Sequence, residues 1–364
     1  MATEHKQRAR DRYAYFVQRH FLWLLLGCYA LAAVWPGPGA SLRQWTWSPG
    51  GLADLRLTVP LLLLAAMLFS AALLTELEQV RSVLGNPLLL CVATAAVWLG
   101  PSLLVVLSGY VVPLFVNGQD ATGVLVGLAL VATMPVANSS TGWTQNTSGN
   151  LALALALVVL SIALCPFVTP GLLNMLGMTL SASERAYCDA LIARFSGVFF
   201  LIWVIVPTVA GFACRRLLTP RRVTLLAPRF ILASAGALLL LNYINAAIAL
   251  PKVHDAPGAV LAFVAFLAMA LSVVGLMSGW LIARLQRLPS DTRTALLFSL
   301  SMKHTGLALA VAATVLANQP IAILMIVLAA LAQHLCAAMV QCLLQRGATA
   351  GRRPAVADLS GSGR

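Results

Sequence analysis

Long apolar runs alternate along the chain with short polar or basic stretches. An α-helix needs about 20 apolar residues to cross the hydrocarbon core of a bilayer. The chain contains ten runs of about this length, and we predict a transmembrane helix in each of them. The predicted helices are residues 20–36, 55–76, 87–110, 122–147, 150–173, 194–214, 229–250, 258–283, 293–317 and 319–343.

Composition favours the same class of protein. Of the 364 residues, 60% are hydrophobic and only 10% are charged, whereas about 25% are charged in an ordinary soluble domain. So few charges do not cover the surface of a soluble protein, but a surface that faces lipid needs none. We therefore predict an all-α membrane protein in contact with the lipid bilayer. The composition argues against a disordered chain and against a nucleic-acid-binding protein.

The basic residues predict how the chain is oriented in the membrane. The net charge is +13, from 24 Lys and Arg against 11 Asp and Glu. With a cytoplasmic N-terminus and ten spans, 18 of the basic residues lie on the cytoplasmic side and 5 lie outside. Cytoplasmic loops of membrane proteins carry such an excess. We therefore predict a multi-pass protein of the cell membrane with both termini in the cytoplasm.

One basic residue belongs to neither side, because Lys303 falls in the middle of the ninth predicted helix. None of the eleven acidic residues falls in the middle of a span. A lone charge at the centre of a bilayer costs at least ~3 kcal/mol on insertion scales. Lys303 therefore needs carbonyl groups, an anionic substrate or the loss of its proton to offset that cost. The alternative is that Lys303 extends to the membrane surface from a differently placed helix.

The fourth predicted helix contains a break. Pro135 removes a backbone donor, and a polar run from Asn138 to Asn150 follows it. Such a run cannot face lipid, because its polar groups would lack partners. It lines a cavity, packs on protein or lies at a membrane surface. For the part from Thr144 onward, a polar loop that joins the fourth and fifth helices is an alternative.

The ninth predicted helix contains a second polar cluster, Ser299 to Ala308. Within it, Thr305-Gly306 repeats the Thr141-Gly142 pair of the fourth helix. The fourth and ninth helices correspond if the chain is two five-helix halves, and an odd number of spans makes the second half inverted. Interrupted helices at matching positions of inverted repeats indicate a transport site near the membrane midplane.

The predicted organisation follows from this repeat. A basic cytoplasmic tail is followed by a first five-helix repeat, an extracellular or periplasmic connection, an inverted second repeat and a disordered cytoplasmic tail. These parts are residues 1–19, 20–173, 174–193, 194–343 and 344–364. The candidate substrate- or ion-binding residues are Asn138, Ser139, Ser140, Thr141, Ser299, Ser301, Lys303, His304 and Thr305, and the candidate helix breaks are Pro135, Gly142 and Gly306. His334 in the tenth helix is expected to be structural.

These motifs resemble the bile acid:sodium symporter family. The resemblance rests on Leu61 to Glu78, Gly85-Asn86-Pro87, Met134-Pro135 through Leu153, and Met302 to Ala308. It implies ten helices in two inverted five-helix repeats whose broken helices 4 and 9 cross. Helices 1, 2, 6 and 7 would form a panel, and the other six would form a core. Transport of an organic anion would then occur by alternating access between core and panel.

The chain departs from the family at the sodium sites. Sodium-dependent members carry Glu-x-x-Met-Gln at the crossing, where this chain has Ser299 and Lys303 in place of the carboxylate and the amide. The hydroxyl ligands of the fifth helix correspond to positions near Ala154 and Val158. We therefore expect no sodium site, no other metal and no cofactor, with Lys303 as a tethered replacement for one coupling sodium.

Other functions compete with this prediction. Transport would be uniport, or proton-coupled if Lys303 or His304 titrates. The alternatives are a sodium-coupled organic-anion symporter and a non-transporting sensor on the same fold. An enzyme is not expected. The catalytic groups of an enzyme would have to be Ser299, Ser301, Lys303 and His304. The identity of the anion and the oligomeric state do not follow from the sequence.

Overall fold

The computed structural model describes residues 16–17, 20–47, 57–76, 78, 83–116, 118–195, 197–253 and 257–350. Nearly all of these residues are helical. The two strands found among them, β1 (Thr46–Trp47) and β2 (Leu57–Thr58), have two residues each and pair antiparallel. The prediction of an all-α membrane protein is confirmed at this level.

Six helical stretches in the described part of the chain are long and apolar enough to cross a membrane. They are α6 (Pro87–Phe115), α9 (Leu151–Thr179), the continuous run of α11 (Val198–Phe200), η3 (Leu201–Ile205) and α12 (Val206–Leu217), α13 (Pro220–Val253), α14 (Gly258–Leu285) and α17 (Pro320–Ala350).

Shorter helices lie between the long ones. α2 (Phe21–Val34) and α3 (Gly37–Gln44) form a pair bent by 93°. The other short helices are α4 (Val59–Leu74), the 3₁₀ turn η2 (Val83–Gly85), α7 (Gly118–Ala132), α8 (Ser139–Asn146), α10 (Ala182–Phe195), α15 (Ser290–Ser301) and α16 (Thr305–Val315).

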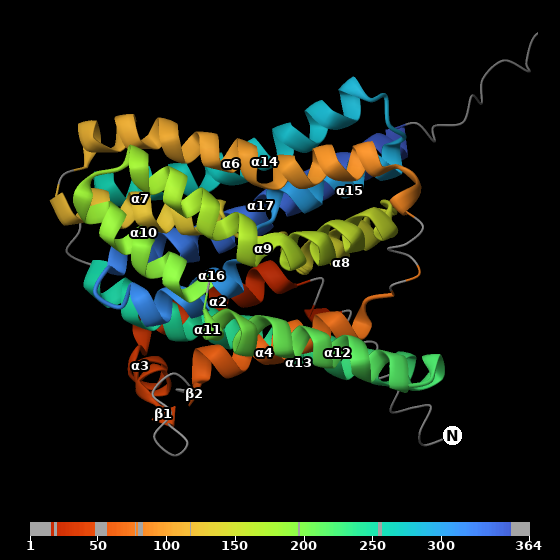
Figure 1. Cartoon of the computed structure of the whole chain (residues 1–364), viewed down its shortest axis with the longest axis horizontal. Helices are drawn as coiled ribbons and strands as arrows, with labels where there is room; N and C mark the ends of the chain where they lie inside the picture. Colours follow the sequence, from red (N-terminus) through yellow and green to blue (C-terminus); the bar gives the residue numbers. More distant parts are fainter. Residues whose placement is uncertain are drawn as a thin grey trace, which may run out of the picture.

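The helices form two layers (Figure 1). In the first layer, α13 packs against α2 and α4, and α12 packs against α4. We call these four helices the panel. In the second, α6 to α9 and α14 to α17 pack together, and we call them the core bundle. The two layers touch chiefly through α13, which packs on both α16 and α17. α4 also contacts α16, and α2 contacts α17.

Several predicted boundaries differ from the observed ones. The predicted connection at 174–193 is largely helical, because α9 continues to Thr179 and α10 begins at Ala182. Residues 344–350 are also helical, as the last turns of α17, where the sequence predicted a disordered tail. In the predicted N-terminal tail, residues 1–15, 18 and 19 lie outside the described residues. α10 mixes charged and apolar residues, so it lacks the long apolar run on which the prediction depended.

Glycines let the core helices approach one another closely. A Cβ atom at Gly279 of α14 would lie 2.7 Å from the carbonyl oxygen of Leu296 in α15. A Cβ at Gly127 of α7 would lie 2.7 Å from the carbonyl oxygen of Ala322 in α17. Small residues allow close packing between helices where lipid supplies no hydrophobic driving force. These contacts fix α7 and α15, which lead into the two helix breaks.

Candidate functional site

Two broken helices cross inside the core bundle. α7 ends at Ala132 and α8 begins at Ser139, while α15 ends at Ser301 and α16 begins at Thr305. The extended segments between them run antiparallel, with Val136 paired to Lys303. The Ala137 N–H donates to the Met302 carbonyl at 3.0 Å, and the His304 N–H donates to the Pro135 carbonyl at 2.9 Å. We call residues 133–138 and 302–304 the crossing.

Neighbouring helices satisfy the backbone of the first extended segment. The Thr133 carbonyl accepts hydrogen bonds from the Trp98 indole at 3.0 Å and from the Thr169 hydroxyl at 2.8 Å. The Val136 N–H donates to the Ser161 hydroxyl oxygen at 3.0 Å. Buried backbone groups without partners are costly, so α6 and α9 stabilise the break that Pro135 imposes.

The second extended segment is held by α17 and by its own cap. The Lys303 N–H donates to Gln333 Oε1 at 2.9 Å, and Gln333 Nε2 lies 3.4 Å from the Thr305 hydroxyl. His304 caps α16, because its Nδ1 accepts the Leu307 N–H at 3.0 Å. The first backbone N–H groups of a helix have no partner within the helix, so a side chain that accepts a hydrogen bond from one of them stabilises the helix start. The polar cluster therefore ends one helix and begins the next without a proline.

The Lys303 side chain is buried and points into the core bundle. It is 3% exposed. Its Nζ donates to the Val97 carbonyl of α6 and, at 3.2 Å, to the Met134 carbonyl just beyond α7. Val97 lies four residues before Pro101, which has no N–H to occupy that carbonyl. Met134 lies at the C-terminal end of α7, where the helix dipole is negative. In the described part of the chain, no carboxylate pairs with Lys303. It does not extend to the surface.

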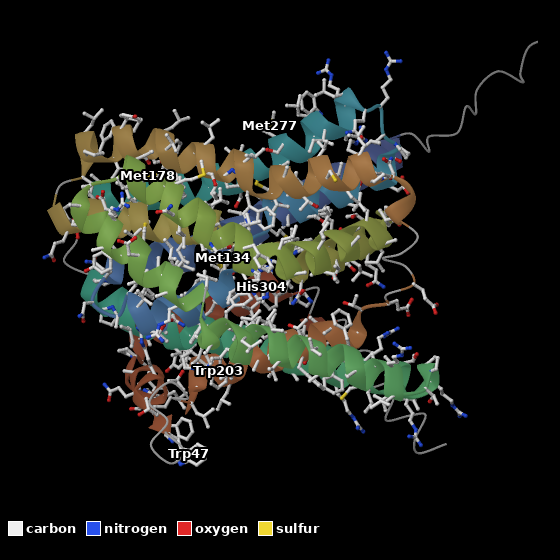
Figure 2. The ribbon with its side chains drawn as sticks, viewed as in Figure 1. Trp47, Met134, Met178, Trp203, Met277 and His304 are labelled. Carbon is white, nitrogen blue, oxygen red and sulfur yellow. The ribbon has the colours of Figure 1, made fainter. Side chains whose placement is uncertain are left out.

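A cavity of about 470 Å³ lies between the crossing and the panel. Figure 2 shows His304 between the two layers, below Met134. Seven of the candidate residues line the cavity, namely Asn138, Ser139, Thr141, Gly142, His304, Thr305 and Gly306. Four further candidates are buried and do not line the cavity, namely Ser140, Ser299, Ser301 and Lys303, and Pro135 also lies off the cavity wall.

Two polar nitrogens on the cavity side have no partner among the described residues. They are His304 Nε2 and Asn138 Nδ2. Since His304 Nδ1 accepts the Leu307 N–H, the neutral imidazole carries its proton on Nε2. Both nitrogens are therefore buried hydrogen-bond donors without a partner among the described residues, and they belong to residues that line the cavity. Of the residues that the structure places on the cavity wall, none is Lys or Arg.

The sequence analysis missed several cavity residues. Gln333 and His334 come from α17, and Trp143 comes from α8. His334 was expected to be structural; its Nδ1 accepts the Trp143 indole N–H at 3.3 Å, and it also lines the cavity. Two adjacent polar residues inside the apolar tenth helix were the signal that was available. Glu76 lies at the edge, 3.2 Å from Arg215 in an ion pair.

Comparison with known families identifies the group to which this fold belongs. The model of the sodium bile acid symporter family matches residues 61–256, more than half of the chain. The chain belongs to this family. No curated protein matches it significantly. As a member of the sodium bile acid symporter family, the protein is a multi-pass membrane transporter of organic anions rather than an enzyme.

The symporter-family match includes the first extended segment but not the second. It covers Thr133 to Asn138, α8 and α9, and it ends at residue 256, before α15. Met302 to His304 and the cavity residues of α17 therefore lie outside the matched region. Ser299 and Lys303, where the sequence analysis predicted a departure from a sodium site, lie in this unmatched part of the chain.

Proposed function

We propose that the protein is a secondary transporter of a small organic anion, that it works by alternating access, and that it does not use sodium. The observation that carries the proposal is the position of the Lys303 ammonium group. It binds two carbonyl oxygens at the crossing, from Val97 and Met134. A sodium ion is bound through oxygen ligands of this kind, so the tethered cation takes the place of a free one.

The electrostatics of the crossing support this role. A buried lysine without a carboxylate needs other negative groups nearby. The carbonyl left free by Pro101 and the C-terminal end of α7 supply them. The Lys303 charge also stays inside the protein through the cycle, whereas a bound sodium would leave. Substrate movement would then need no sodium gradient.

Anion recognition would use neutral hydrogen-bond donors that lie near the Lys303 charge. His304 and Asn138 line the cavity, and their Nε2 and Nδ2 donors are buried without a partner among the described residues, so a shift of the crossing would bring them to an anion. α8 and α16 both begin at the cavity wall, with Ser139 and Thr305, and helix N-termini favour negative groups. Protonating His304 Nδ1 would remove the cap of Leu307. We therefore favour uniport over proton coupling through this residue.

The proposed transport cycle rests on ten spans in two inverted five-helix repeats, residues 20–173 and 194–343. Helices α7–α8 and α15–α16 would be the broken fourth and ninth spans. The turns α12–α13 and α14–α15, which carry Arg215, Arg216, Arg221, Arg222, Arg284 and Arg287, lie at the same end of the molecule (Figure 1). We assign this end to the cytoplasm, with both termini. Because Glu76, Gln145 and Asn146 also line the cavity, it would open to that side.

The test is anion uptake into proteoliposomes with sodium or choline as the external cation. We expect equal uptake in both, and no stimulation by an imposed pH gradient. Strong dependence on sodium would overturn the proposal in favour of a sodium-coupled symporter. Specific binding of anions without any flux would instead indicate a sensor on the same fold.

A further inference from the structure

The bent pair α2–α3 places α3 at the end of the molecule away from the α12–α13 turn (Figure 1). We call the α3 end the outer end. The cavity extends toward the other end, because Glu76 on its wall pairs with Arg215 of α12. Of the described residues on the cavity wall, none belongs to α3 or to the part of α16 after Gly306. The cavity therefore does not reach the outer end.

α3 is attached to the panel. The Tyr243 hydroxyl of α13 donates to the carbonyl of Trp35, in the bend between α2 and α3, at 2.7 Å. Gly39 of α3 packs so closely on α13 that a Cβ atom there would lie 2.5 Å from the Cβ of Ala247. α3 should therefore move with the panel whenever the panel moves against the core bundle.

One side chain of α3 crosses from the panel to the core bundle. Arg43 Nη2 donates to the Ala313 carbonyl of α16 at 3.2 Å. Because α16 ends at Val315, this carbonyl is one of the last in the helix, which have no partner further along it. The C-terminal end of a helix also has a partial negative charge, which favours a guanidinium group. Arg43 thus caps a core helix from the opposite layer.

The contact between Arg43 and α16 is suited to opening and closing repeatedly. The Arg43 side chain is half-buried, and its Nη1 has no partner among the described residues. No carboxylate within the described ranges pairs with it. A bidentate ion pair with a carboxylate would be stronger than this one bond to a carbonyl. A single bond holds the outer end closed without making it permanent.

We propose that Arg43 and the Ala313 carbonyl form an outer latch, which closes the outer end while the cavity is open toward the other end and releases when the panel moves. The proposal rests on alternating access, as part of the function proposed above. It adds the contact that would have to break before the transported anion could pass the outer end.

The latch covers one face of α16 that leads to the crossing. A Cβ atom at Gly306 would lie 3.1 Å from the Met67 side chain of α4, so this residue faces the panel. Residues four and seven positions further along a helix share a face with it, and these are Ala310 and Ala313. Release of Arg43 would therefore expose a path along α16 from the outer end to the crossing.

The experiment measures the rate at which a charged maleimide labels Ala310→Cys in the full chain in nanodiscs. Ala310 is buried and does not line the cavity, so labelling at this position requires the outer end to open. Mass spectrometry of the peptide that contains residue 310 separates this reaction from labelling of the native cysteines. Because a hydrogen bond from a charged group shifts an equilibrium about tenfold or more, adding Arg43→Met should speed the labelling about tenfold.

The matched control is Arg185→Met, at an exposed arginine of α10. α10 lies near the same end, because its Tyr187 hydroxyl accepts a hydrogen bond from Gln319, a few residues after α16. This control should leave the labelling rate unchanged. A second test variant keeps the arginine: Gly39→Ala should push α3 off α13 and also speed the labelling.

The outcomes decide between a latch and a simple helix cap. Unchanged labelling in Arg43→Met, even with a lower melting temperature, would overturn the latch and leave Arg43 as a cap of α16. Equally fast labelling in Arg185→Met would also overturn it. If Arg43→Met does not fold, Gly39→Ala decides by the same measurement. Sodium-dependent uptake would overturn the proposed function without changing the labelling rates, so the two proposals fail separately.

Discussion

The crossing has two faces with opposite chemistry. On the buried face, the Lys303 side chain bonds to carbonyls of α6 and of the segment after α7. On the open face, the side chains of His304 and Asn138 line the cavity and carry buried donors that have no partner among the described residues. Successive side chains of an extended segment point to opposite sides, so neighbouring residues 303 and 304 come to lie on different faces. A break of three residues thus separates a fixed charge from the groups that meet the substrate.

This difference assigns distinct roles to two adjacent polar residues. On the buried face, the Lys303 ammonium group is satisfied by carbonyls of the protein and should determine its stability. Donors on the open face have no partner among the described residues and should determine the affinity for the anion. Substitutions on the two faces should therefore change different measured quantities, and five predictions test this comparison.

The largest effect should follow the loss of the buried charge. Lys303→Met keeps an unbranched side chain as far as Cε but leaves the Val97 and Met134 carbonyls without their donor. Each buried unsatisfied group costs about 1–3 kcal/mol, so the melting temperature should fall and anion uptake should be lost. Thermal unfolding and proteoliposome uptake measure both effects. A stable Lys303→Met protein with full uptake would contradict the role of the buried face.

Pro101 offers the next test, because its replacement should lack the usual stabilising effect. Replacing a helix-interior proline by alanine normally favours the helix by about 3 kcal/mol. Pro101→Ala, however, supplies an N–H that competes with Lys303 for the Val97 carbonyl. We expect lower uptake and no gain in melting temperature from this substitution. Pro113→Ala, at an exposed position of the same helix, is the control and should leave uptake unchanged.

A double mutant isolates the contact between Lys303 and α6. In the Lys303→Met background, Pro101→Ala should raise the melting temperature, because the Val97 carbonyl then gains a partner without losing one. Non-additivity of this kind measures direct coupling between two sites. Additive effects of the two substitutions would show that Pro101 acts independently of Lys303.

The sequence predicted one break better than the other. Pro135 and the polar residues after it are local signals of the first break. The apolar runs of the chain predicted the long helices α6, α9 and α14 to within several residues. The bond from Lys303 to Val97 joins residues 206 positions apart, so no local pattern contains it. For the same reason Gln333 was missed, since its role depends on how α17 packs beside the crossing. Local chemistry predicted where the helices break, and packing decided which groups satisfy the breaks.

On the open face, His304→Asn should change affinity more than stability. Asparagine is a good helix cap, so the start of α16 should be retained. Its shorter side chain does not place a donor where Nε2 lies. We expect KM for anion uptake to rise by about tenfold, the effect of ~1.4 kcal/mol, with little change in melting temperature. A large fall in melting temperature at unchanged KM would reverse the assignment of His304 to the open face.

The smallest effect should come from Ser299, which lies on the buried face but has no partner. Its hydroxyl is buried and unbonded among the described residues. Removing it by Ser299→Ala deletes an unsatisfied group, so the melting temperature should stay the same or rise slightly. KM and the indifference to sodium should not change, because Lys303 already supplies the positive charge. Loss of uptake in Ser299→Ala, but not in a Ser278→Ala control in α14, would show that this hydroxyl binds an ion during the cycle. The buried face would then contain a second cation site beside the lysine.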